Sequence, residues 1–254
     1  MTDVYWLEQT ESDVSAEDSW LSASEMVRLN SLYVPKRRVD WRLGRWTLKR
    51  AAAAYLDLPA DLCTLAAAEI RRAPSGAPEV FLHDRPAGIV VSLTHRSGTA
   101  ACAVASANTE LGCDLEAVEP RSDTFIADFF TTAEQSLIAQ APAADRPWFT
   151  ALLWSAKESA LKALHAGLRL DTRWVQVHLD EIISTPLCAV ESGNWHPLRV
   201  SGPDSRLFHG WWVYKGDLVR TLVAAPAPSY PIALKLAALD ESHCASVPPC
   251  QENR

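Results

Sequence analysis

The sequence predicts an α+β fold in which helices and strands occur in a similar mixture in both halves of the chain. Two long segments, 24–56 and 147–166, carry apolar residues at helical spacing. Runs of β-branched and aromatic residues, broken by turn signals, fill much of 89–120 and 210–225 and predict neighbouring strands. With 254 residues, the chain is long enough for one large domain or two small ones with a sizeable core.

The first half begins with a short predicted strand, 4–7, and an acidic loop. Helical signals then dominate as far as residue 56, and Pro35 is expected to break or kink this run because its ring does not fit inside a helix. Residues 71–88 are rich in loop formers and contain only short extended pieces. The predicted strands that start at residue 89 follow.

In the second half, one or two helices are expected in residues 122–140. Asp145 is a candidate cap and Pro147 a candidate first turn for the next helix, which runs to about Ala166 with Gly167 as its stop signal. Alternating patterns predict antiparallel strands in the segments 174–182, 187–191, 210–215 and 218–225. A Pro-rich tail follows from Pro226 and is expected to be disordered from Asp240.

Charge and hydropathy argue against several classes of function. The formal net charge of −7 opposes general nucleic-acid binding. No apolar run reaches the roughly 18 residues needed to span a bilayer, so no membrane association is expected. The acidic start, MTDVYWLEQTESD, lacks the basic-then-apolar order of a secretory signal, and we expect a soluble cytoplasmic protein. The six cysteines form no C-x-x-C pair, so a zinc site is not expected.

One segment is strongly basic against this acidic background. KRRVDWRLGRWTLKR (36–50) contains seven Lys and Arg residues and a single Asp. Arg38, Arg42, Arg45 and Lys49 recur every three or four residues, so they share one helix face. The segment fits either an anionic ligand or an ordinary solvated helix face.

Two carboxylates, Asp114 and Glu116, are expected to point to the same side of a strand because they are two residues apart. Such a pair repels unless it is protonated or bridged by a cation, and its hard oxygen ligands suit Mg²⁺. The alternative is an exposed strand end with two solvated acids, and a D-x-E motif alone does not decide between them.

A second pair of charges lies in WSAKESALKAL (154–164). Glu158 and Lys162 are four residues apart and therefore adjacent on a helix, while Lys157 lies about a quarter-turn from Glu158. An ordinary salt bridge between Glu158 and Lys162, worth only about 0.3–0.5 kcal/mol, would explain the pair equally well.

Taken together, these segments resemble the paired signature of the 4′-phosphopantetheinyl transferases of the surfactin-synthetase type, approximately G-[IV]-D-[IVL]-E and W-x-x-K-E-[SA]-x-x-K. GCDLE (112–116) and WSAKESALK match every charged position, and Cys113 is the departure. FFTTAE (129–134) matches the usual F-F-[ST]-x-x-E, with Glu134 as its acid.

Two further elements agree with this family. VSLTHRSG resembles its S-x-[ST]-H element and gives Ser92 and His95. KRRVDWRLGR resembles its upstream K-R-R-x-[DE]-x-x-x-[GA]-R helix and gives Arg37 and Arg45. The four residues are the expected coenzyme A-binding residues of the N-terminal half, and the whole match spans about 36–168.

The resemblance implies an α+β fold of two similar halves, related by a pseudo-twofold axis, with the active site in the cleft between them. The halves would be 1–106 and 107–226, followed by the tail 227–254, in one monomeric chain. It also implies transfer of 4′-phosphopantetheine from coenzyme A to a serine of an apo acyl, polyketide or peptidyl carrier protein, with Mg²⁺ as cofactor and 3′,5′-ADP as the released product.

The same resemblance implies a role for each charged residue of the signature. Asp114, Glu116 and Glu158 would hold Mg²⁺ against the pyrophosphate of coenzyme A. Lys157 and Lys162 would bind phosphate oxygens, with Lys162 placed to stabilise the leaving group. Glu158, directly or through a metal-bound water, is the candidate base for the carrier serine.

One departure from the family concerns the G-K-P element, whose lysine helps to hold coenzyme A in many relatives. Here residues 76–78 read GAP, and Arg71 or Arg72 is a candidate to replace the missing lysine at Ala77.

Two other functions remain as alternatives. One is a catalytically inactive paralogue that binds coenzyme A or a carrier protein, and the other is a different Mg²⁺-dependent enzyme such as a nucleotide phosphodiesterase. For the transferase, we expect the carrier to dock on residues 124–137, with Phe125 and Ile126 in contact.

Overall fold

The computed structural model describes residues 1–178 and 193–240, and in these residues the predicted α+β class is confirmed. Helices and strands occur in both halves of the chain, which we call the N-terminal half (1–106) and the C-terminal half (107–226). Within the described residues, no helix combines the length and the apolar character needed to cross a membrane.

The helices of the N-terminal half include two that the sequence analysis placed inside one segment. Pro35 is the first residue of the second of them, where its missing N–H has no partner to lose, so it starts a helix instead of kinking one. The elements in chain order are β1 (Tyr5–Thr10), α1 (Ala23–Asn30), α2 (Pro35–Tyr55), α3 (Leu62–Ala67), β2 (Ala68–Arg72), β3 (Pro78–Leu82), β4 (Arg85–Pro86), β5 (Ile89–Arg96) and β6 (Thr99–Ser106).

The C-terminal half begins after a short turn. Its elements are β7 (Glu110–Ala117), α4 (Asp123–Phe129), α5 (Thr132–Gln140), α6 (Arg146–Ala163), β8 (Gln176–His178), β9 (His196–Ser201), β10 (Leu207–Lys215) and β11 (Leu218–Ala225). α6 ends a few residues earlier than predicted, and His165 takes the left-handed conformation that follows it (φ 52°). The strand predicted at 187–191 lies outside the described residues, as does the end of the one predicted at 174–182.

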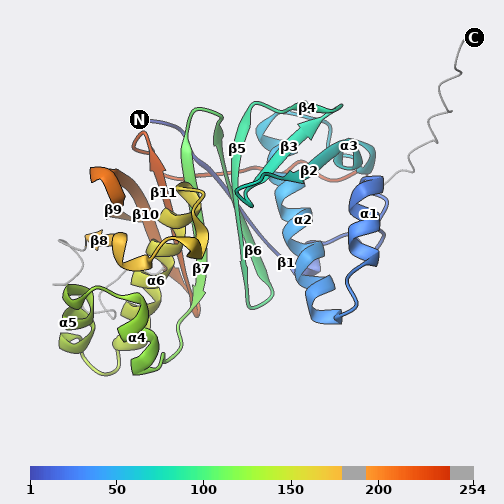
Figure 1. Cartoon of the computed structure of the whole chain (residues 1–254). Coiled ribbons are helices and arrows are strands. Elements are labelled where there is room, and N and C mark those ends of the chain that lie inside the picture. The colour runs from blue at the N-terminus through green and yellow to red at the C-terminus, as the bar shows by residue number, and fades with distance from the viewer. Residues whose placement is uncertain (179–192, 241–254) are drawn as a thin grey trace, which may run out of the picture.

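The two halves have equivalent sheets. In each, the first strand of the half pairs with the last, and the last pairs with the strand before it, so that β1-β6-β5 corresponds to β7-β11-β10. A long helix packs on one face of each sheet, α2 in the N-terminal half and α6 in the C-terminal half. Figure 1 shows the two sheets side by side, with β5, β6 and β7 at the centre of the molecule. This is the predicted arrangement of two similar halves.

The equivalence extends to one buried ion pair in each half. In the C-terminal half, Lys157 Nζ of α6 lies 2.9 Å from Glu134 Oε2, the acid of the capping box that starts α5. In the N-terminal half, Lys49 Nζ of α2 lies 2.5 Å from Glu25 Oε2, the acid of the capping box that starts α1. Both lysine side chains are completely buried. In each half, the same kind of buried ion pair therefore joins the long helix to the start of a shorter helix, α1 or α5.

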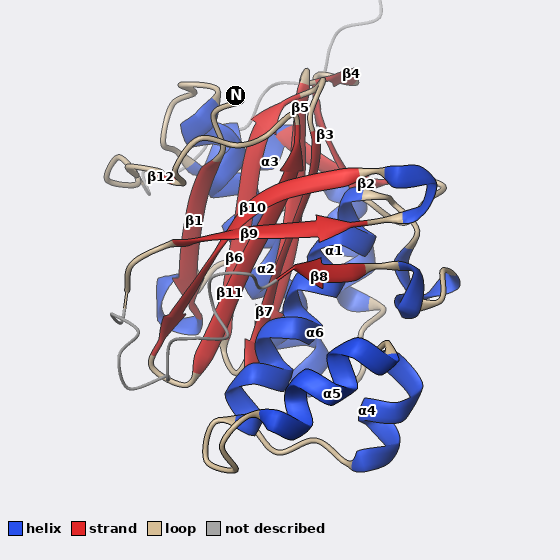
Figure 2. Cartoon of the chain, turned by 90° about the vertical axis from the view of Figure 1, so that its left-hand side faces the viewer, coloured by secondary structure: helices blue, strands red, loops and turns tan. Residues whose placement is uncertain are grey.

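The tail does not leave the molecule at Pro226. β12 (Ile232–Ala233) pairs in parallel with β1, and Leu234 and Leu236 pack against the core between α2 and the N-terminal sheet. Residues 241–254, expected to be disordered, lie outside the described residues. In Figure 2, α4 and α5 lie together beside α6, at one end of the C-terminal half.

Candidate functional site

The site lies where the two sheets meet, along β5 and β7. The Ser92 Oγ accepts a hydrogen bond from the Cys113 backbone N–H (2.9 Å), and the Thr94 Oγ1 accepts one from the Leu115 N–H (3.2 Å). Both hydroxyl-bearing side chains are buried. The S-x-T part of the predicted element therefore joins the halves, and it fixes β5 against the strand that carries the acidic motif.

Asp114 is the most enclosed carboxylate of the site. Its Oδ1 accepts hydrogen bonds from the Thr94 hydroxyl (3.0 Å) and from the Lys162 amine (2.8 Å), which also donates to the Cys113 carbonyl (2.9 Å). Its Oδ2 is buried and has no hydrogen-bond partner among the described residues. Burial alone would lower the pKa of Lys162, but the Asp114 carboxylate overcomes this and raises it. One oxygen of Asp114 thus positions Lys162, while the other is available to bind a ligand.

α6 approaches β7 unusually closely because of Gly112. A Cβ atom at this position would lie 1.8 Å from the Ser159 carbonyl oxygen of α6, so no other residue fits without moving the helix. The close approach brings Glu158 and Lys162, which are one turn apart on α6, to the strand that carries Asp114 and Glu116. The glycine of the GCDLE motif therefore determines how closely Glu158 and Lys162 approach the strand with the acidic residues.

Glu158 has a raised pKa of about 7. Burial is the largest cause, followed by the charge of Asp114, while Lys162 acts in the opposite direction. No hydrogen bond to this carboxylate is formed by the residues that the structure describes. A carboxyl group that is half-protonated near neutral pH is suited to accept a proton.

Glu116 is held by neighbours that the sequence analysis did not name. Its Oε1 accepts a hydrogen bond from the Trp154 indole N–H (3.1 Å), and its Oε2 lies 2.8 Å from Nη2 of Arg121. Burial, and then the charge of Asp114, raise the pKa of Glu116, while Arg96 and Arg121 lower it. The tryptophan belongs to the W-x-x-K-E motif, so its role was open to prediction, whereas nothing in the spacing indicated Arg121.

The three carboxylates, Asp114, Glu116 and Glu158, form the acidic cluster. Besides burial, the charge of Asp114 raises the pKa values of Glu116 and Glu158, and the free Asp114 Oδ2 is a buried acceptor, so the residues fit a hard cation. As the side chains stand, however, the described residues include no group of three His, Cys, Asp or Glu ligands close enough to hold a metal. Both carboxylate oxygens of Glu116 are already engaged, by Trp154 and Arg121, so metal binding would compete with these contacts.

Lys157 does not reach the acidic cluster, and the expectation that it binds phosphate is corrected. Its amine pairs with Glu134 and donates to the Thr172 carbonyl (2.9 Å) and the Val175 carbonyl. Burial lowers the pKa of Lys157, and Glu134 opposes that change. The quarter-turn between Lys157 and Glu158 places them on different sides of α6, so one is structural and the other belongs to the site.

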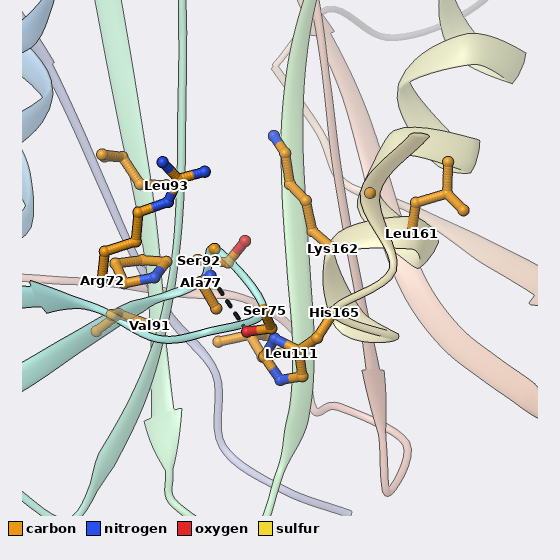
Figure 3. A pocket seen from close by; sticks show the side chains of 13 residues that line it. Arg72, Ser75, Ala77, Val91, Ser92, Leu93, Leu111, Leu161, Lys162 and His165 are labelled. Carbon is orange, nitrogen blue, oxygen red and sulfur yellow. Dashed lines mark hydrogen bonds between the residues drawn. The ribbon is translucent and has the colours of Figure 1, made fainter. Parts of the chain in front are cut away.

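A cavity of about 270 Å³ lies between the halves, and Lys162, which contacts Asp114 of the acidic cluster, is part of its lining. We call it the central cavity, and Figure 3 shows it from close by. From the N-terminal half it is lined by Arg72, 75–78 and 91–93, and from the C-terminal half by Leu111, Leu161, Lys162, His165 and Gly167. Of the predicted site residues, the structure brings Ser92 and Lys162 to this cavity.

His95 lies near the face of α2 that carries Gly44. A Cβ atom on Gly44 would lie 3.9 Å from the His95 ring, and the charges of Asp40 and Lys36 both reach it. His95 is exposed at its surface, but the neighbouring residues still remove part of its ring from water, and this desolvation is the largest cause of its lowered pKa. Arg37 is exposed and lies seven residues before Gly44, so it shares this face of α2.

Arg45, by contrast, forms its contacts inside the N-terminal half. Its Nη1 donates to the Ile70 carbonyl (3.0 Å) and lies 3.6 Å from Glu25, and its guanidinium stacks over Trp41. Its neighbours on the predicted basic face likewise form contacts within this half: Arg38 bonds to α1, Arg42 to the loop before α1, and Lys49 to the backbone of α3. The structure does not bring Arg45 to the central cavity, and this basic face serves mainly to attach α1.

These features define a group-transfer site: a carboxyl that can take a proton, a lysine held by an aspartate, and a cation-lined cavity between two halves. The model of the 4′-phosphopantetheinyl transferase superfamily matches residues 110–201. The 4′-phosphopantetheinyl transferase Svp of Streptomyces mobaraensis is 33% identical over 207 residues, which cover 77% of this chain and 75% of Svp. The chain therefore belongs to the 4′-phosphopantetheinyl transferase superfamily.

Among solved structures, the chain is also similar to the holo-[acyl-carrier-protein] synthase (AcpS) of Helicobacter pylori, crystallised in complex with coenzyme A. That likeness has 17% identity and a TM-score of 0.31, and it covers 41% of this chain and 99% of the synthase.

Proposed function

We propose that this protein transfers 4′-phosphopantetheine from coenzyme A to a serine of apo carrier proteins, with Mg²⁺ as cofactor. Membership of the superfamily supports the reaction class. The single observation that supports the chemistry most strongly is the contact of Lys162 with Asp114, one turn of α6 away from Glu158 and on the wall of the central cavity.

In this proposal, Asp114, Glu116 and Glu158 hold the metal ion. The buried free oxygen of Asp114 and the raised pKa values of the two glutamates support that assignment. When bound, Mg²⁺ would neutralise negative charge on the pyrophosphate of coenzyme A.

Glu158 takes the proton of the carrier serine. The serine oxygen then forms a bond to the phosphorus that carries pantetheine, and the bond from that phosphorus to the bridging oxygen breaks. The bridging oxygen leaves on 3′,5′-ADP, and the Lys162 ammonium stabilises its negative charge. Asp114 keeps Lys162 protonated for this role, because it raises the pKa of the amine.

His95 and Arg37 are the proposed contacts for the 3′-phosphate of coenzyme A. Both lie on the side of the site formed by α2 and β5, and they are the predicted basic residues of the N-terminal half that are exposed. His95 is close enough to the site for the charges of Lys162 and Asp114 to affect its pKa. A remote phosphate bound here would supply binding energy without taking part in the bond change.

The carrier protein is proposed to dock near α4. Phe125 is only partly exposed, because it packs against Trp154 with ring centroids 5.0 Å apart and lies under Arg121. Ile126 also packs on the core. A carrier on this surface would therefore contact residues that pack against Trp154, and Trp154 in turn donates a hydrogen bond to Glu116 of the acidic cluster.

One assay tests the proposed function and separates it from the two alternatives. The protein is incubated with coenzyme A, Mg²⁺ and an apo carrier, and the intact mass of the carrier is measured together with nucleotide products. The proposal predicts a carrier heavier by one phosphopantetheine group. Binding of coenzyme A with an unchanged carrier would indicate an inactive paralogue, and coenzyme A cleavage that needs no carrier would indicate a phosphodiesterase.

A further inference from the structure

A second cavity lies in the N-terminal half, and its walls contain none of the residues of the proposed reaction site. We call it the tail cavity, because part of the C-terminal tail lines it. Its volume is about 390 Å³, and it shares no lining residue with the central cavity. The lining comes from the end of β1 and the segment after it, from α2 and from the tail: Gln9, residues 12–16, Trp46, Arg50, Leu236 and Leu239.

Arg50 gives this cavity a buried positive charge. The residue is only 8% exposed, and no aspartate or glutamate among the described residues forms an ion pair with it. Its Nη2 donates a hydrogen bond to the Ala237 carbonyl of the tail (3.0 Å), and the guanidinium lies over the Trp46 ring. Burial lowers the pKa of Arg50, and no carboxylate charge acts in the opposite direction. Most of its five N–H donors are therefore available to a ligand.

Arg220 is the other arginine of the described residues that is buried to this degree, and it is paired. It is 6% exposed and contacts both oxygens of Glu8, at distances of 2.7 and 2.6 Å. Removing a charge from water without a counter-charge is costly, so buried charges are normally paired. The unpaired Arg50 on a cavity wall therefore indicates that its counter-charge comes from a molecule outside the chain.

Two more side chains in the wall have polar atoms without a partner. Gln9 Oε1 and Trp46 Nε1 are buried, and neither forms a hydrogen bond with any residue in the described ranges. Buried polar atoms of native proteins are nearly always satisfied. The Gln9 amide presents either its oxygen or its NH2 group when it turns about its last side-chain bond, whereas the Trp46 indole offers a donor only. The wall therefore combines a cation with unused hydrogen-bonding groups.

Asp13 also lines the cavity, and it does not supply the missing counter-charge. Its Oδ2 accepts hydrogen bonds from the Thr10 backbone N–H (2.7 Å) and the Thr10 hydroxyl (2.9 Å), so it is directed to its own turn. The residue is exposed, and water screens its charge. Arg50 thus remains the dominant charge in the buried part of the wall.

From this arrangement we propose that the tail cavity is a second ligand site, which binds the carboxylate or phosphate group of a small organic molecule against Arg50. The guanidinium would donate paired hydrogen bonds to two oxygens of such a group, and Trp46 and Gln9 would supply further donors. The cavity volume is in the usual range for small-molecule sites, so there is room for an organic part beside the anionic group. The site is independent of coenzyme A and of the carrier.

A ligand in this position would also strengthen the attachment of the tail. The tail is held by the hydrogen bond from Arg50 to Ala237 and by one from the Asp240 N–H to the Ala60 carbonyl (2.7 Å). Leu236, which lines the cavity, lies between these contacts and the rest of the tail. Lys235 in the same segment is exposed, so trypsin cleavage after it reports whether the tail is attached.

The test measures thermal unfolding of the full chain in chloride buffer at constant ionic strength, with and without an added anion. The probes are inorganic phosphate, glycerol 3-phosphate, acetate and succinate. At about ten times the dissociation constant, mass action predicts that Tm rises by roughly 3–5 °C with the phosphates or with the carboxylates, whichever group the site binds. Arg50→Met should lose this rise, and Arg206→Met, a change at an exposed arginine outside the cavity lining, should keep it.

Two further measurements locate the anion. The NMR signal of the Trp46 indole N–H, assigned with Trp46→Phe, should shift when the same anion is added. Trypsin cleavage after Lys235 should become slower with the anion in the unmodified protein but not in Arg50→Met. In anion-free buffer, Arg50→Met should be at least as stable as the unmodified protein, because an apolar side chain replaces an unpaired buried charge.

Three outcomes would overturn the proposal. A rise in Tm that persists in Arg50→Met would place the anion elsewhere, for instance in the central cavity. If neither the Tm nor the Trp46 indole signal of the unmodified protein responds to any of the four probes, the cavity binds no such group, whether or not Arg50→Met folds. A large loss of stability in Arg50→Met without anion, together with an unmodified protein that does not respond, would show that Arg50 only holds the tail.

Discussion

Lys157 and Glu134 form an ion pair, 2.9 Å long, in which both side chains are at least 99% buried. The pair does not belong to the reaction site, although Lys157 directly precedes the proposed base in the sequence. Its counterpart in the N-terminal half, Lys49 with Glu25, has the same surroundings, since Glu25 and Glu134 each also accept a hydrogen bond from a strand N–H at 3.2 Å. The W-x-x-K part of the signature is therefore a structural element that both halves share.

Lys157→Met should destabilise the protein without a specific effect on coenzyme A binding. Removing one partner leaves Glu134 as an unpaired buried charge, which typically costs about 3–5 kcal/mol. Urea unfolding should show this loss, and Lys49→Met should show a similar one. A folded, stable Lys157→Met protein with strongly weakened coenzyme A affinity would contradict the structural role.

Gly112→Ala should disrupt the site by pushing α6 away from β7. The added Cβ atom would overlap the Ser159 carbonyl, at a separation of 1.8 Å, and the helix that carries Glu158 and Lys162 would have to move. We expect a large fall in both stability and turnover. Gly202→Ala is the matched control, because a Cβ atom there meets its nearest neighbour at 3.5 Å. Comparable melting temperatures for the two variants would show that the close approach is not required.

Glu158→Gln should stabilise the protein in Mg²⁺-free buffer at high pH only. The pKa of this carboxyl is raised from 4.5 to about 7 on folding, so the folded state keeps a proton that the unfolded state loses between these values. Stability therefore falls as pH rises from 4.5 through 7, and the full penalty applies above 7. At pH 8.5, Glu158→Gln should recover on the order of 1–3 kcal/mol.

At pH 4 the same substitution should make little difference, because Glu158 is then protonated in the folded state. Glu79→Gln, a change at an exposed glutamate, serves as the control at both pH values. A gain of stability from Glu158→Gln that is the same at both pH values would show that its ionisation is not the cause.

The unmodified protein should prefer coenzyme A to dephospho-coenzyme A. If His95 meets the 3′-phosphate, His95→Ala should reduce that preference roughly tenfold, measured as the ratio of kcat/KM values. Arg45→Ala should leave the ratio unchanged, because Arg45 is committed to Ile70 and Glu25. A ratio that responds to Arg45 but not to His95 would reverse this assignment.

The long helices and the main strands could be predicted because their signals are local. The apolar spacing of α2 and α6 and the alternation in β10 and β11 all lie within single segments. The end of α6 was misplaced because His165 already takes the left-handed conformation after the helix, two residues before Gly167, which takes it as well.

The contacts of the site depend on residues far apart in the chain, and spacing alone does not reveal them. Thr94 lies 20 residues before Asp114, and Trp154 lies 38 residues after Glu116. Their contacts follow from β5 lying beside β7 and α6 crossing it. The role of Lys157 was misassigned because adjacency in the sequence hides the quarter-turn that sends its side chain to the other side of α6. The repeated W-x-x-K, at Trp46 and Trp154, was the available signal that this lysine is structural.

The most direct test of the account measures the rate of carrier modification by Asp114→Asn across a range of Mg²⁺ concentrations. The substitution keeps the shape of the side chain and an acceptor for Thr94, but it removes the charge that holds Lys162 and would hold the metal. We expect a folded protein whose rate is at least about 100-fold below that of the unmodified protein at every Mg²⁺ concentration. A rate equal to that of the unmodified protein at low millimolar Mg²⁺ would contradict the central claim that Asp114 organises this site.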